Sequence, residues 1–124
     1  MRFPIIEDSF VKDNRAELSF TVSPELDWFE GHFEALKILP GMALCVFVME
    51  FTTRYLSLDL YSGMSSLPQV KFIKPILENY QVTLIMTKNE DFKTLEFEVV
   101  DTADRSITYA TGKFKYIPVY LRKE

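Results

Sequence analysis

The sequence predicts an α+β fold in which a curled antiparallel sheet wraps around one long buried helix. The helix is indicated by the apolar run MALCVFVM, which lies within residues 41–56 and is typical of a helix buried on all sides. Most of the remaining chain alternates apolar with polar residues in segments joined by short turns, and short connections favour antiparallel pairing. One helix packed on one sheet is a stable layer arrangement.

The strands can be placed in order along the chain. Ile5 to Lys12 is expected to form the first strand, and Glu17 to Val22 the second, because its apolar and polar residues alternate strictly. Ser23-Pro24-Glu25 is typical of a capped turn that opens a short helical turn before Trp28. Four further strands are predicted near residues 69–72, 82–87, 94–99 and 110–116, with turns at 78–79, 89–91 and 101–105.

Size and composition limit the classes of protein to which the chain can belong. A length of 124 residues is typical of a single domain, here 1–124, and 48% apolar content excludes a disordered chain. The net charge of −4 offers no general electrostatic attraction to nucleic acid or to an anionic membrane. One cysteine cannot form an intrachain disulfide, and the first residues lack the continuous apolar segment of a signal peptide. The apolar run is too short to insert across a membrane, so we expect a cytoplasmic protein.

Two motifs stand out against this background. The first is Phe29-x-Gly31-His32-Phe33, followed by Ile38-Leu39-Pro40-Gly41 directly before the predicted helix. The second is Val70-Lys71-Phe72-Ile73-Lys74-Pro75-Ile76. Together they resemble the FxGHFPxxPxxPG signature and the "ARFKRPV" strand of the 3-hydroxyacyl-[acyl-carrier-protein] dehydratases, which have the hot-dog fold. The spelling of the first motif is most similar to the branch associated with aryl-polyene-type pathways.

The resemblance implies a reaction and its setting. A dehydratase of this kind removes water from a 3-hydroxyacyl group on acyl-carrier protein and gives the trans-2-enoyl thioester, in fatty-acid or polyene-type lipid biosynthesis. The family implies no metal, and no cofactor beyond the carrier's phosphopantetheine arm. It also implies a homodimer or larger assembly, with a tunnel at the dimer interface. The residues that the resemblance places at the substrate are Phe33, Leu39, Pro40, Val46 and Phe72.

His32 and Gly41 are the leading catalytic candidates. Removal of a proton next to a thioester carbonyl needs a base that titrates near neutrality, and histidine is the side chain that does so. Backbone N–H groups at a helix start lack intrahelical partners and lie at the positive end of the helix dipole. A thioester oxygen at Gly41 would therefore be polarised as enolate character develops. The alternative for Gly41 is that it only permits a sharp turn after Pro40.

The usual acid of the family is missing. The bacterial fatty-acid dehydratases have an acidic residue fourteen positions after the histidine, and counting from His32 gives Val46. Glu34 and Lys37 also replace prolines of the family motif. Glu50 is the only acid in the predicted helix, one turn beyond Val46. Apolar surroundings would raise the pKa of its carboxyl and suit it to proton donation, whereas the glutamine often found there in the family favours a structural role.

The other candidates are less specific. Cys45 lies in the apolar run and is expected to be a small core residue. Lys71, Lys74, Lys113, Lys115 and Arg54 could form a local basic patch for an acidic carrier protein, or could simply be solvated. The substitution at Val46 also leaves two alternatives open, an acyl-thioester hydrolase and a non-catalytic acyl-binding or partner subunit.

Overall fold

The computed structural model describes residues 1–30 and 37–118. Along the chain it places β1 (Asp8–Lys12), β2 (Arg15–Thr21), a short 3-10 helix η1 (Asp27–Phe29), α1 (Gly41–Leu56), β3 (Gln69–Phe72), β4 (Gln81–Asn89), β5 (Thr94–Asp101) and β6 (Thr108–Lys115). The first strand begins three residues later than the sequence predicts, at Asp8 instead of Ile5. The predicted helix bounds are confirmed, because Pro40 stands before the first turn and Ser57 adopts a left-handed conformation after the last.

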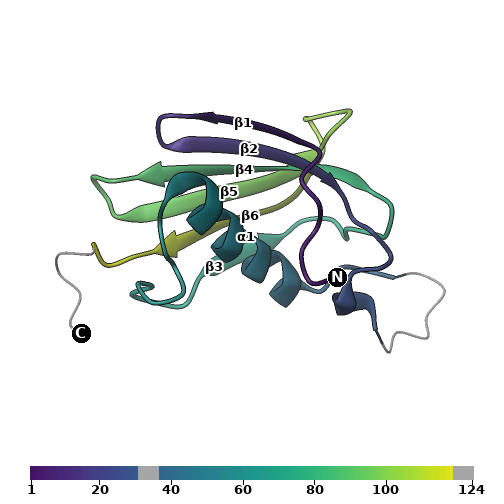
Figure 1. The fold of residues 1–124 in the computed structure, drawn as a ribbon, viewed down its shortest axis with the longest axis horizontal. Coiled ribbons are helices and arrows are strands. Elements are labelled where there is room, and N and C mark those ends of the chain that lie inside the picture. The colour runs from purple at the N-terminus through teal and green to yellow at the C-terminus, as the bar shows by residue number, and fades with distance from the viewer. Residues whose placement is uncertain (31–36, 119–124) are drawn as a thin grey trace.

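The six strands form one antiparallel sheet with the order β1-β2-β4-β5-β6-β3. Figure 1 shows β1 and β3 at opposite edges, with α1 lying across one face of the sheet. β3 precedes β4 in the chain, yet it lies beside β6 at the far edge. The predicted α+β class is confirmed, and the arrangement is that of a hot-dog fold.

The core lies between α1 and the sheet face that it covers. The faces predicted for β4 and β5 are confirmed, since Leu84 pairs with Val99 and Met86 pairs with Phe97 in the buried cluster. β4 is nevertheless buried on both of its faces between residues 82 and 86. Phe47 stands at the centre of an aromatic group, with its ring centroid 6.2–6.4 Å from four other rings. Those rings belong to Phe3, Phe20, Trp28 and Phe51. The N-terminal segment, β2 and η1 are thus joined to the helix through one side chain.

The expectation of a helix buried on all sides is wrong for the described chain. One side of α1 is fully buried, through Ala43, Leu44, Phe47, Val48, Phe51, Thr52 and Leu56. The other side is open: Met42 is 69% exposed, and Cys45, Val46 and Met49 are only half-buried. A single sheet covers one face of a helix, so this apolar strip is left for another covering element.

The sheet face away from α1 is polar but well ordered. The hydroxyls of Ser19, Thr83 and Thr102 form a chain of hydrogen bonds of 2.9 and 3.0 Å across the strands. Glu17 accepts from Arg105 at 2.7 Å and from Arg15 at 3.2 Å, and the Arg105 hydrogen bond is the main cause that lowers the pKa of its carboxyl. Across the described residues, no helix has the length and apolar character required to cross a bilayer.

We expect Phe47→Ala to destabilise the fold severely. The side chain is fully buried, and removing a buried phenylalanine costs about 3–5 kcal/mol through lost transfer energy and the cavity left behind. Urea denaturation followed by circular dichroism measures the change. The matched control is Phe92→Ala, because Phe92 is 78% exposed and its loss should change the unfolding free energy by about 0.5 kcal/mol or less. Similar losses for both variants would contradict this account of the core.

Candidate active site

The two sequence motifs lie side by side in the structure. The Leu39 N–H donates to the carbonyl of Ile76 at 2.8 Å, and the Glu78 N–H donates to the carbonyl of Lys37 at 3.1 Å. Ile38 and Leu77 form an isolated antiparallel bridge between these two bonds. The segment that leads into α1 is therefore fixed to the segment that follows β3. This backbone pairing determines where the helix N-terminus meets the second motif.

A cavity of about 340 Å³ lies at this junction. Its lining comes from both motifs and consists of Ile38, Leu39, Pro40, Gly41, Leu44, Phe72, Ile73, Lys74, Pro75 and Ile76. Of the substrate residues named from the sequence, Leu39, Pro40 and Phe72 are brought together here, next to Gly41. Val46 does not line this cavity and lies on the open, half-buried side of α1. His32 and Phe33 lie outside the residues that the structure describes.

Phe72 packs directly against Gly41 at the helix start. A Cβ atom built on Gly41 would lie 2.5 Å from the tip of the Phe72 ring, far closer than a real contact allows. The φ angle of Gly41 lies outside the left-handed region, so a special turn conformation does not explain the glycine. Pro40 is the N-cap, and no side chain among the described residues caps the helix. The amides of Gly41 and Met42 lack an intrahelical acceptor and can therefore serve a ligand in the cavity.

The surroundings of Glu50 are not the apolar ones that the sequence predicts. Its carboxylate accepts from Arg54 Nε at 2.7 Å and from the Tyr61 hydroxyl at 3.2 Å, and its side chain is 25% exposed. Burial raises the pKa of the Tyr61 hydroxyl, and the nearby Glu50 charge raises it further. The Arg54 contact could have been expected, since ion pairs on helices form at a spacing of four residues. No such spacing predicts the contact with Tyr61, because this residue lies in the loop after α1.

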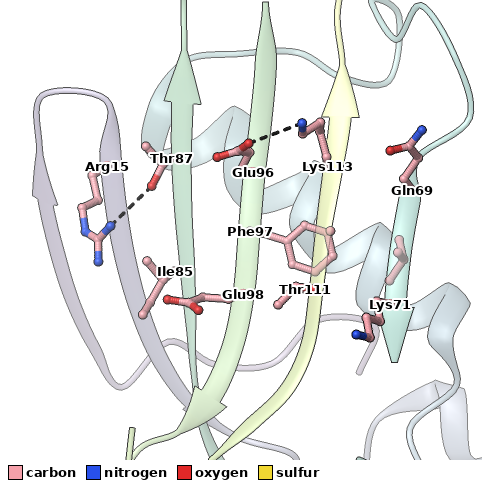
Figure 2. Close-up of a pocket in the computed structure, with 12 residues that line it drawn as sticks. Arg15, Gln69, Lys71, Ile85, Thr87, Glu96, Phe97, Glu98, Thr111 and Lys113 are labelled. Atoms are coloured by element: carbon pink, nitrogen blue, oxygen red, sulfur yellow. Dashed lines mark hydrogen bonds and ion pairs between the residues drawn. The ribbon is translucent and has the colours of Figure 1, made fainter. Parts of the chain in front are cut away.

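The five basic residues named from the sequence do not form one patch. Lys71 and Lys113 line a hollow of about 540 Å³ on the sheet face away from α1 (Figure 2). Lys113 Nζ lies 3.6 Å from a carboxylate oxygen of Glu96, and a dashed line marks this ion pair in Figure 2. Lys74 lines the cavity beside Gly41, whereas Arg54 is bound to Glu50 on the helix.

Cys45 is half-buried, and this burial raises the pKa of its thiol.

Comparison with known proteins decides the family to which this fold and cavity belong. The model of the ApeI-like family, described as ApeI dehydratase, matches residues 8–113. The chain belongs to the ApeI-like dehydratase family. The match includes both motifs, α1 and most of the sheet, and it supports a dehydratase activity for the chain.

Solved structures agree with this assignment. The dehydratase heterocomplex ApeI:P from Xenorhabdus doucetiae is 28% identical with a TM-score of 0.76, over 91% of this chain and 96% of that one. An uncharacterized protein from Erwinia carotovora subsp. atroseptica is 28% identical with a TM-score of 0.73, over 94% of each chain. Thioesterase superfamily member 2 from Mus musculus, 14% identical with a TM-score of 0.62 over 90% of this chain and 88% of that one, shares the fold alone. No curated protein matches the sequence.

The space around Gly41 in α1 and around Gly112 in β6 predicts different changes in stability when each is replaced by alanine. At Gly41 the clash is with the end of the Phe72 ring, which is 56% exposed and can swing away, and alanine gains about 1 kcal/mol of helix propensity. At Gly112 the new Cβ would lie 2.2 Å from the buried Phe97 ring and 3.0 Å from the backbone oxygen of Gln69. We expect Gly41→Ala to fold with near wild-type stability and Gly112→Ala to lose about 1–3 kcal/mol. Urea denaturation of both variants tests this, and equal losses would contradict it.

Proposed function

We propose that this ApeI-like protein dehydrates a 3-hydroxyacyl group on acyl-carrier protein to the trans-2-enoyl thioester. The observation that carries the proposal is the meeting of the two family motifs around the N-terminus of α1, which no described side chain caps, in a chain that matches the dehydratase family over residues 8–113. The cavity at this point is lined mainly by apolar side chains, which suits an acyl chain. An aryl-polyene-type pathway is the setting that we propose for the reaction.

The reaction needs a base, an oxyanion donor and a proton for the leaving hydroxyl. In the proposed mechanism the Gly41 N–H donates to the thioester oxygen and stabilises the negative charge that develops there. His32 removes the proton from the α carbon, and the electron pair forms the double bond as the C–O bond of the β-hydroxyl breaks. The departing hydroxyl takes up a proton and leaves as water. No metal or further cofactor enters the proposed mechanism.

Two groups could supply that last proton. Glu50 is the acid nearest in sequence to the position of the missing acid, but its carboxylate is engaged with Arg54 and Tyr61. The other group is the His32 imidazolium, which carries the α proton after the first transfer and could return it to the hydroxyl. We favour the imidazolium, because Glu50 lies one helical turn beyond position 46 and could reach the hydroxyl only if the substrate were bound further along α1.

The active assembly is proposed to contain more than one subunit. Apolar side chains around the cavity and the β3 edge are exposed to 42–69%, namely Ile38, Met42, Phe72 and Ile73. Such a group is typical of a surface that another subunit covers. We propose a homodimer in which the sheet continues across β3, with Lys74 beside the cavity entrance as one contact for an acidic carrier protein.

A second candidate function is a partner subunit without catalysis of its own. The valine at position 46 favours it, and the related Xenorhabdus doucetiae dehydratase is described as a heterocomplex. Dehydration by the purified chain alone would exclude this alternative. Release of free thiol from an acyl thioester, without formation of the enoyl product, would instead favour a hydrolase.

We expect His32→Ala to abolish dehydration while the fold is retained. Loss of a positioned general base reduces the rate by about 10²–10⁴-fold. Intact-mass spectrometry of carrier protein loaded with a 3-hydroxyacyl group measures the loss of one water. Ser66→Ala, on an exposed loop, is the matched control and should react like wild type. A His32→Ala variant with near wild-type rate would overturn the proposed mechanism.

The Glu50→Gln variant decides between the two proton donors. Glutamine keeps the size and can still bond to Tyr61, but it cannot donate an acidic proton. If His32 returns the proton, the variant should react at close to the wild-type rate, and the lost ion pair should change the stability by only about 0–1 kcal/mol. A rate reduced by about 10²-fold or more, with the melting temperature unchanged, would identify Glu50 as the donor.

A further inference from the structure

β1 is an edge strand without cover on its outer side. It pairs only with β2, and it forms the upper edge of the sheet in the view of Figure 1. All five of its residues are exposed, including Phe10 at 57% and Val11 at 45%. The outer edge of such a strand presents unpaired N–H and C=O groups that can accept a further strand. The described chain supplies no strand on that side.

The side chains of β1 form a charge pattern that is complementary to its own reverse. Asp8, Phe10 and Lys12 alternate along the strand and so share one face. Phe10 lies opposite Glu17, which places this set on the sheet face away from α1. Neither Asp8 nor Lys12 takes part in an ion pair within the described residues. Their charges are therefore available to an approaching strand.

We propose that the β1 edge binds the β1 edge of a second copy of this chain, antiparallel, around a two-fold axis through Phe10. In this register Asp8 of each copy lies opposite Lys12 of the other, and the two Phe10 rings are adjacent across the axis. Opposite charges and aromatic pairs at directly facing positions stabilise neighbouring strands. A two-fold axis makes both ion pairs identical, which is the self-complementarity that a symmetric interface requires.

The β3 edge, across which the sheet continues in the proposed homodimer, does not offer this charge match. β3 has four residues, and Lys71 is its only charged one, so reversal of the strand places no acid opposite a base. The β1 contact is also small, because it has only five residues on each side. A standard interface has about 20–30 residues on each side and buries roughly 1,200–2,000 Å². The contact therefore joins copies or preformed dimers weakly, and its extent depends on concentration. It involves no residue of the cavity beside Gly41.

Charge reversal at the two positions provides the test. Lys12→Asp places acid opposite acid at both pairs, and Asp8→Lys places base opposite base, so each variant alone should associate at least about 10-fold more weakly than wild type. An equimolar mixture of the two variants restores both opposite pairs and should regain wild-type association. The double variant Asp8→Lys/Lys12→Asp is self-complementary again and should also associate as wild type does. Multi-angle light scattering over a concentration series reports the molar mass.

The controls separate this interface from other surfaces and from unfolding. Lys115→Asp reverses an exposed lysine on β6 and should leave the association unchanged. The double variant carries both changes, so its recovery excludes misfolding as the cause of the single-variant losses. The proposal is overturned if wild type shows no concentration-dependent increase in mass. It is equally overturned if the single variants associate like wild type, which would assign the contact to another surface, or if the mixture fails to recover.

Discussion

The packing of the α1 aromatic side chains against the sheet is the interaction on which the rest of the structure depends. Phe47 contacts rings from the N-terminal segment, β2, η1 and the next turn of its own helix. Burial of each such ring contributes on the order of 2–3 kcal/mol. Because the candidate oxyanion donor lies at the first residue of α1, this cluster also determines where the donor points. Core packing and site geometry are thus two consequences of one set of contacts.

The helix forms only one side of the candidate site. The other side is positioned by backbone hydrogen bonds between the segment before α1 and the segment after β3. Residues 37–39 are bonded to residues 76–78, so the first turn of α1 faces the segment that follows β3. Phe72 then lies on Gly41, and the cavity opens between them. β3 is an edge strand, and the open side of α1 is apolar. The cavity therefore lies at the border of the single chain, where a covering subunit would complete both the core and the site.

Local periodicity explains which parts of this arrangement were predictable. Alternation in β4 and β5 identified the buried face, and Pro40 marked the helix start, because both signals are carried by neighbouring residues. The position of β3 beside β6 follows from pairing across some forty residues, which periodicity does not encode. The same holds for Gly41 and Phe72, and for Glu50 and Tyr61. Sequence separation concealed the contact of Phe72 with Gly41 and the hydrogen bond from Tyr61 to Glu50.

The position of Glu50 bears on how dehydration could proceed in a chain that has valine instead of an acid at position 46. The ion pair with Arg54 is no obstacle, since an exposed pair of this kind contributes only about 0–1 kcal/mol. Distance is the stronger constraint. Four residues along a helix amount to about 6 Å, while proton transfer requires a heavy-atom separation of about 2.6–3.2 Å. A substrate seated for an acid at position 46 would lie beyond the reach of Glu50 unless it were bound one turn further along α1. Return of the proton by the base that removed it needs no such shift, which is why the imidazolium route fits this chain better.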